Sequence, residues 1–511
     1  MKTATGLSTI RLIKLIALVC LAIFFITVTI GGRYFSGARS IAESPQPLNE
    51  SPNAAATPLP PTISPQLPND VNLPSQLPPG IPFQFFDDFS WRSFVALVWP
   101  AQQGQRGVPD TTKTVGDAGP LVFETFKADW EVFQPNGAQP SNWNSYSGTN
   151  PCGNVTPQFG DMILASFSKF SNLGQAGFGN LVGPLVAQNN TYVRYQAAFD
   201  QIGYSQILGK QWYLKANLGT PTPANPLVFN NGSINLKSAW IDMTNIPHPE
   251  RYYTRTAWLY DLVSQQCSQK TVGLVGLHIV VKTPMRPQWI WASFEQVDGI
   301  PETGAHSPYT FNDGSETAMP VKNPITYPPP TTPPTKFNVT RTMPITDSTM
   351  QTNAVYQQAL KNKGSGVWQY YQLVMTQWPT PGNTPTNPGS PPFTIPGSGL
   401  SNNTSFANVT METFFQANVS TSCMACHNVI KNQTDFNWTL NNHAFSPTNP
   451  LTPLALGDHT PVAMTALRAK KAKQISPELQ QLKAILEQGR SRPPTPKVKP
   501  KPSPKPVKKK P

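Results

Sequence analysis

Hydrophobic and polar positions first follow a helical spacing at residues 86–97 (FDDFSWRSFVAL). Apolar side chains recur there every three or four positions, which predicts a helix with one apolar face. We expect Asp87 or Asp88 to cap this helix and Pro100 to end it. Two more helices are expected, at 123–133 and 191–208.

A different pattern begins near residue 234, where Val, Ile, Trp, Tyr and Thr concentrate in short runs separated by turn signals. Such runs are typical of β-strands, and residues 283–287 (TPMRP) have the composition of a hairpin turn. The predicted strands are 236–243, 252–261, 271–282 and 289–297. The two patterns together predict an α+β fold: an antiparallel β-sheet region packed with helices, followed by a helical C-terminal segment.

An unbroken run of apolar or small residues covers 15–32, with Lys14 before it and Arg33 after it. Its eighteen residues exceed the ~7–15 of a signal-peptide core and approach the ~20 that span a bilayer. We therefore expect a membrane anchor, with a cleaved signal as the alternative. Both place the body outside the cytoplasm, on the periplasmic side of a bacterial cell.

The residues Cys423–His427 (CMACH) form a CxxCH motif near the C-terminus. Two thiols at this spacing can each form a thioether to one vinyl group of a haem, and the adjacent imidazole then binds the iron. A redox dithiol or part of a metal site is the alternative, although a structural zinc ion needs two further Cys or His ligands nearby. We predict one covalent haem c, held by Cys423, Cys426 and His427.

The second axial ligand of the iron would decide the function, because methionine suits electron transfer and an open position admits small molecules. Met464 follows the motif at a usable distance but is equally explained as a loop or core methionine. His278 lies in a strongly apolar predicted strand, as either a hydrogen-bonded core histidine or a distal ligand or haem-pocket residue. His443 and His459 have polar neighbours and are expected at the surface.

Polar and aromatic residues of the last predicted strand allow two readings each. Glu295 would orient a group near the haem, or form a salt bridge with Lys282 or Arg286. Trp289 and Trp291 alternate on one strand face, so they line the haem edge or belong to the sheet core. Cysteine use leaves one further pair, Cys152 and Cys267, which is either a disulfide of an exported protein or two buried thiols.

Proline-rich segments flank the part of the chain that can fold. Eleven prolines lie between residues 44 and 80, and eight prolines mix with eight basic residues at 492–511. We expect the first segment to be an extended spacer and the second to be disordered. The predicted organisation is a cytoplasmic N-terminus (1–12), a transmembrane anchor or signal (13–32), a Pro-rich linker (33–82), an α+β body (83–400), a c-type haem segment (401–466), an amphipathic helix region (467–490) and a Lys/Pro tail (491–511).

The net charge of +13 is unevenly distributed. Residues 1–40 carry +5 and residues 468–511 carry +12, which leaves −4 for everything between them. The body is therefore mildly acidic, and we expect no nucleic-acid partner. The basic tail either binds an anionic cell-envelope polymer or only increases solubility.

Several segments together resemble a largely uncharacterised family of exported bacterial proteins that carry one c-type haem motif near the C-terminus. The segments are 89–100, 123–127, 273–284, 288–298 and 411–427. The resemblance covers most of 83–446 and implies an extracytoplasmic cytochrome c without indicating a substrate. The anchor, the linker and the Lys/Pro tail are additions to the family pattern.

These patterns predict a membrane-anchored, extracytoplasmic, mono-haem c-type cytochrome that transfers single electrons to an unidentified redox partner. A haem enzyme or small-molecule sensor with an open distal site is the first alternative, because the body is larger than a simple electron carrier needs. A cell-envelope adhesion or scaffold protein is the second. The sequence contains no P-loop, GxGxxG or HExxH motif.

Overall fold

A computed structural model of the 511-residue chain gives the arrangement of the body. The residues that it describes are 57–74, 83–153, 155–167, 184–218, 227–261, 263–315, 325, 329–378, 407–416, 423–427 and 430–446. All of them belong to one compact unit, Ala55–Pro511. The fold of this unit is α+β, as the sequence predicts.

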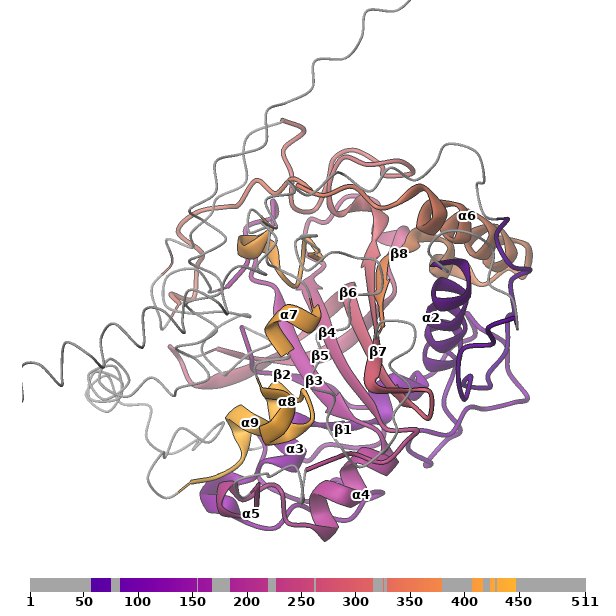
Figure 1. Ribbon diagram of the computed structural model, residues 1–511. Coiled ribbons are helices and arrows are strands. Elements are labelled where there is room, and N and C mark those ends of the chain that lie inside the picture. The colour runs from indigo at the N-terminus through magenta and orange to yellow at the C-terminus, as the bar shows by residue number, and fades with distance from the viewer. Residues whose placement is uncertain are drawn as a thin grey trace, which may run out of the picture. The chain divides into compact units, whose positions relative to one another are not determined.

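An eight-stranded sheet runs through the body (Figure 1). The strands are β1 (Lys127–Ala128), β2 (Ile163–Leu164), β3 (Arg194–Phe199), β4 (Ile234–Asp242), β5 (Thr254–Asp261), β6 (Gln266–Thr283), β7 (Arg286–Gln296) and β8 (Tyr371–Gln377). The long strand β6 organises the sheet: β4 pairs along one edge, while β5 and β7 pair with the first and second halves of the other edge. Strand β8 extends the sheet beyond β7, and β3 and β1 extend it beyond β4.

The four predicted strands are confirmed as β4 to β7, and the predicted turn joins β6 to β7. The pairings among these four strands are antiparallel. The short strand β2, which the sequence pattern missed, pairs with β5 in the parallel direction and makes the sheet mixed.

The helices are short, apart from two. They are α2 (Phe83–Leu97), α3 (Asp129–Val132), α4 (Gln201–Gly209), α5 (Lys215–Leu218), α6 (Asp347–Asn362), α7 (Cys423–His427), α8 (Lys431–Thr434) and α9 (Trp438–His443), with 3-10 turns η1 (Val122–Thr125), η2 (Pro135–Gly137), η4 (Pro249–Arg251), η5 (Val297–Gly299), η6 (Gly366–Tyr370) and η7 (Thr413–Phe415). Helices α2 and α6 lie beside β7 and β8, whereas α7, α8 and α9 lie together at another part of the sheet (Figure 1).

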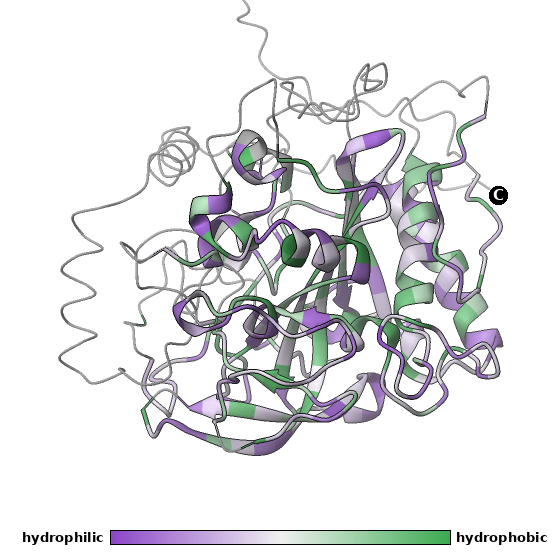
Figure 2. Cartoon of the chain, turned by 90° about the horizontal axis from the view of Figure 1, so that it is seen from below, coloured by the Kyte–Doolittle hydropathy of each residue, from purple (hydrophilic) through white to green (hydrophobic). Residues whose placement is uncertain are grey.

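Aromatic packing fixes α2 against the sheet. The Trp91 ring stacks on Tyr356 of α6 at 5.1 Å and meets Phe294 of β7 edge-on at 5.1 Å. Hydrophobic residues, green in Figure 2, follow the strands and the helix faces that meet. The helix is confirmed, but its predicted caps are wrong. It begins at Phe83, so Asp87 lies inside it and is fully buried.

Two predicted helices are wrong in part. Residues 123–133 divide into η1, β1 and α3, and residues 191–208 divide into strand β3 and helix α4. In β3, residues Tyr195, Ala197 and Phe199 recur at every second position and are buried, which is a strand period. Helix α4 begins only after Asp200, whose carboxylate accepts hydrogen bonds from the first-turn amides.

Residues 57–74 of the predicted spacer contact the body, so this part does not hold it at a distance. Within 57–74, Asp70 accepts a hydrogen bond from the Met285 amide at 2.9 Å, and the Thr62 amide donates to the Tyr356 hydroxyl at 3.3 Å. Val71 packs against the main hydrophobic core. These contacts fasten part of the Pro-rich segment to the body.

The prediction of a transmembrane protein is wrong for the part of the chain that the structure describes. No helix within those residues is both long and apolar enough to cross a bilayer. The predicted anchor at 13–32, the helix region at 467–490 and the tail at 491–511 lie outside the described residues.

Candidate functional site

The CxxCH motif forms its own short helix, α7. Cys423 and Cys426 are three positions apart and share one helix face, and His427 follows directly. All three side chains are half-buried. The predicted attachment residues therefore lie together on one helical turn.

The imidazole of His427 has a defined orientation. Its Nδ1 lies 2.6 Å from the carbonyl oxygen of Phe436. A carbonyl only accepts hydrogen bonds, so Nδ1 carries the proton and donates it. In the neutral ring, Nε2 then carries the lone pair that a metal would use.

Two tryptophans hold α7 in place. The Trp291 ring lies 4.3 Å from the His427 ring, and the Trp291 indole N–H donates to the carbonyl of Gln288 at 2.9 Å. The Trp438 indole N–H donates to the carbonyl of Cys426 at 3.2 Å. Trp291 thus meets the motif, as one of its two predicted roles requires, while it also belongs to the sheet core.

A buried ion pair includes Asp435, the residue directly before Phe436, whose carbonyl contacts His427. The ammonium of Lys282, on β6, is 2.9 Å from a carboxylate oxygen of Asp435, and both side chains are 1% exposed. The same oxygen accepts the Phe229 amide, and the Trp289 indole N–H donates to the Asp435 carbonyl at 3.1 Å. The sequence leaves Lys282 or Arg286 as the salt-bridge partner of Glu295, and no local pattern singles out Asp435.

His278 lies on the same sheet face as Trp291. On β6 it is two positions from Val280, which pairs directly with Trp291, so it is a diagonal neighbour of that ring. Its Nε2 is 3.5 Å from a carboxylate oxygen of Glu412, in the segment 407–416. Both predicted roles of His278, core histidine and pocket residue, stay open. The other predicted distal ligand, Met464, lies outside the described residues.

Lys237 lies near Cys423 and begins a chain of ionisable residues that continues to Asp129 and His443. Lys237 pairs with His278 across the strands, and burial lowers the pKa of its ammonium to about 8, although Asp129 and Cys423 favour the charge. Burial raises the pKa of Asp129 to about 7. The prediction that His443 lies at the surface is wrong. The side chain is buried, and its Nδ1 is 4.0 Å from the Asp129 carboxylate.

Glu295 belongs to a different cluster. Its carboxylate pairs with Arg341 and accepts the amide hydrogen of Val409, and Arg341 also pairs with Glu302. The predicted salt bridge from Glu295 to Lys282 or Arg286 is wrong. Glu295 fixes the path of the segment 407–416 over the sheet.

The prediction of a metal-binding group formed by side chains is wrong for the described residues. They contain no set of three or more His, Cys, Asp and Glu residues that could hold a metal ion.

A disulfide joins Cys152 to Cys267 at the start of β6, with a Cα–Cα distance of 5.4 Å. The sequence left this pair open between a disulfide and two buried thiols. The bond closes a loop across 115 residues and fastens the segment before β2 to the sheet.

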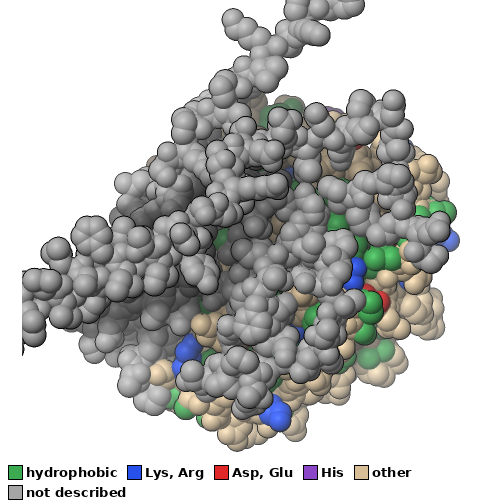
Figure 3. Space-filling view, viewed as in Figure 1, with side chains coloured by type: hydrophobic (Ala, Val, Ile, Leu, Met, Phe, Trp, Pro, Cys, Tyr) green, Lys and Arg blue, Asp and Glu red, His purple; other side chains and the backbone are tan. Residues whose placement is uncertain are grey.

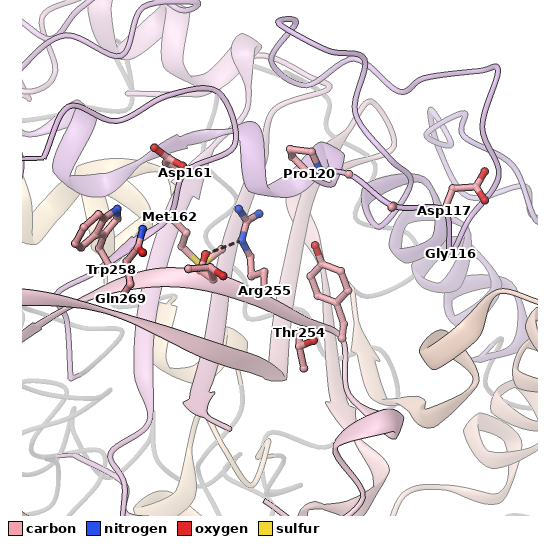
Figure 4. Close-up of a pocket in the computed structure, with 13 residues that line it drawn as sticks. Gly116, Asp117, Pro120, Asp161, Met162, Thr254, Arg255, Trp258 and Gln269 are labelled. Atoms are coloured by element: carbon pink, nitrogen blue, oxygen red, sulfur yellow. Dashed lines mark hydrogen bonds between the residues drawn. The ribbon is translucent and has the colours of Figure 1, made fainter. Parts of the chain in front are cut away.

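A pocket of about 540 Å³ lies beside β5, and no residue of α7 lines it. Asp161, Arg255, Trp258 and Gln269 line it together with the loop 116–120 (Figure 4). The Arg255 guanidinium is already paired with buried Glu124 at 2.5 Å.

The described Lys and Arg side chains visible in Figure 3 lie apart from one another, so this view gives no charged docking surface.

No family model matches the chain, and neither a curated protein nor a solved structure is detectably similar to it. The resemblance to exported c-type haem proteins therefore stays a prediction. The functional argument depends on the geometry around α7.

Proposed function

We propose that the chain binds one haem covalently through Cys423 and Cys426, with His427 as the proximal ligand, and transfers single electrons. One observation carries the proposal: the Nδ1–H of His427 is bound to the Phe436 carbonyl, which leaves Nε2 as the ligating atom. The two cysteines on the same helix face fit the two thioether positions.

The attachment chemistry balances without a further reactant. Each thiol adds across one vinyl group, so that its sulfur forms a C–S bond and its hydrogen forms a C–H bond. Neither an oxidant nor a reductant is consumed, provided that Cys423 and Cys426 are both reduced. When bound, the haem supplies one-electron chemistry, and the protein sets the ligands and the burial.

The disulfide Cys152–Cys267 supports an extracytoplasmic location. Disulfides persist in oxidising compartments and are rare in the cytosol of mesophiles. We therefore propose that the body works on the periplasmic side. The proposed partner is a redox protein of that compartment.

Absorption spectra of the full chain, coexpressed with a haem-attachment system, test the proposed role. We expect a low-spin haem whose ferrous form does not bind CO, because electron transfer is served by two protein ligands. If His278 is the second ligand, His278→Ala should bind CO, whereas the control His443→Ala should not.

Two results would contradict one-electron transfer as the role. A high-spin wild-type haem that binds CO readily would favour an enzyme or a sensor. If the variant Cys423→Ser plus Cys426→Ser lost the haem but kept full function in cells, the scaffold alternative would stand.

A further inference from the structure

We propose that Lys282 and Asp435 are positioning residues for His427: their buried ion pair fixes a strained turn whose carbonyl orients the imidazole. The inference rests on the proposed haem function and adds a role for residues outside the motif. It concerns the bond between the His427 Nδ1–H and the Phe436 carbonyl.

The turn is strained at consecutive residues. Asp435 has φ 49° and Phe436 has φ 68°, both in the left-handed region that residues with side chains rarely adopt. Trp289, whose indole N–H binds the Asp435 carbonyl, has φ 71°. Such a conformation is sterically disfavoured and persists only where surrounding contacts impose it.

The imposing contacts come from the ion pair. One oxygen of the Asp435 carboxylate accepts hydrogen bonds from the Lys282 ammonium and from the Phe229 amide, both at 2.9 Å. The Lys282 ammonium also donates to the Pro287 carbonyl at 2.5 Å. The charge of each group is therefore compensated, and the turn is fastened to β6 and to the β6–β7 hairpin.

A single residue, Phe436, connects the turn at Asp435 to His427. Phe436 follows Asp435 directly and is 1% exposed, so the direction of its carbonyl depends on the turn. A fixed acceptor at Nδ1 sets the tautomer and the ring orientation of a metal-binding histidine and increases the basicity of Nε2. We infer that loosening the turn weakens this bond and raises the reduction potential of the bound haem.

The test compares Asp435→Asn with Glu295→Gln, which alters a buried ion pair without a link to His427. The first readout needs no haem: long-range ¹⁵N NMR of the histidine-labelled full chain, which has six histidines. His427→Gln identifies the signal. We expect an Nδ1–H tautomer in the wild type and in Glu295→Gln, and about a fivefold lower Nδ1–H to Nε2–H ratio in Asp435→Asn, as for the loss of one hydrogen bond.

The second readout is the midpoint potential of the haem-loaded protein, which we expect to rise more in Asp435→Asn than in Glu295→Gln. An unchanged tautomer and potential in Asp435→Asn, or an equal change in both variants, would overturn the inference. If Asp435→Asn does not fold, Trp289→Phe removes one contact of the turn and gives the same test. A wild type without covalent haem would refute the proposed function. The NMR comparison would still test whether the turn sets the tautomer of His427.

Discussion

Two buried ion pairs connect the sheet to distant parts of the chain, and they differ in what they hold. Lys282 on β6 binds Asp435, and Glu295 on β7 binds Arg341. All four side chains are at most 5% exposed. Glu295 also accepts a hydrogen bond from the backbone of 407–416. Asp435 is followed by Phe436, whose carbonyl accepts the hydrogen bond from His427. The same chemistry thus fastens the chain in one place and, in our proposal, orients the His427 imidazole in the other.

The difference follows from the backbone next to each pair. Glu295 lies in β7 outside the left-handed region, so at that residue the ion pair has no backbone strain to oppose. Asp435 lies in the left-handed region, and its ion pair compensates for that strain. Burial raises the pKa of both carboxyl groups, and the neighbouring cations oppose that shift. Electrostatics alone therefore does not distinguish the two pairs; their backbone context does.

The largest expected effect is on stability, and it should be similar for both pairs. Lys282→Met and Arg341→Met each leave a buried carboxylate without its cation, which costs ~3–5 kcal/mol. Urea unfolding of the two variants measures this loss. A loss below ~1 kcal/mol in either variant would show that water reaches the carboxylate. Only Lys282→Met should also change the haem spectrum.

A smaller effect on stability is expected when a single indole hydrogen-bond donor is removed, either at the turn of Asp435 or in helix α2. Trp289→Phe removes the indole N–H that binds the Asp435 carbonyl, and Trp91→Phe removes the one that binds the Asn353 side chain at 2.9 Å. Each leaves a buried acceptor with one donor fewer and should cost ~1–3 kcal/mol in urea unfolding. Only Trp289→Phe should shift the His427 tautomer. An equal shift in both variants would show that the turn responds to general loss of stability.

The effect that is smallest per pH unit concerns a buried carboxyl group that the described residues pair with no cation. Burial raises the pKa of Asp87 from 3.8 to about 7, although hydrogen bonds from Thr349 and Thr376 oppose the shift. The folded state then binds a proton that the unfolded state releases, so stability falls as the pH rises from about 4 to about 7. The slope is at most ~1.4 kcal/mol per pH unit.

Asp87→Asn should remove that part of the pH dependence of unfolding. Lys282→Met and Arg341→Met should retain it. Urea unfolding of wild type and Asp87→Asn at several pH values provides the comparison. Identical slopes in the two proteins would mean that Asp87 is ionised in the folded state at neutral pH.

Local sequence patterns predicted the strands and the motif because each depends on residues close together in the chain. The runs of β4 to β7 were recognisable from composition and turns, and Cys423 and His427 from fixed spacing. The predicted helix at 191–208 failed because the strand period of β3 lies directly before a helix start.

The supporting residues of the site could not be predicted in the same way. Lys282 and Asp435 are 153 positions apart, and no local pattern connects them. A weak signal existed: Lys282 ends a strongly apolar strand, where a charge needs a partner. From the sequence, Glu295 is the nearest acid and could pair with Lys282 or Arg286, because the sequence does not show which distant segment covers the strand.

The most direct test is the absorption spectrum of the full chain after expression with a haem-attachment system and extraction with acid acetone. We expect one haem per chain that survives extraction in the wild type and is lost in Cys423→Ser plus Cys426→Ser. A wild-type protein without covalent haem would contradict this expectation, and α7 would then be read as a dithiol site.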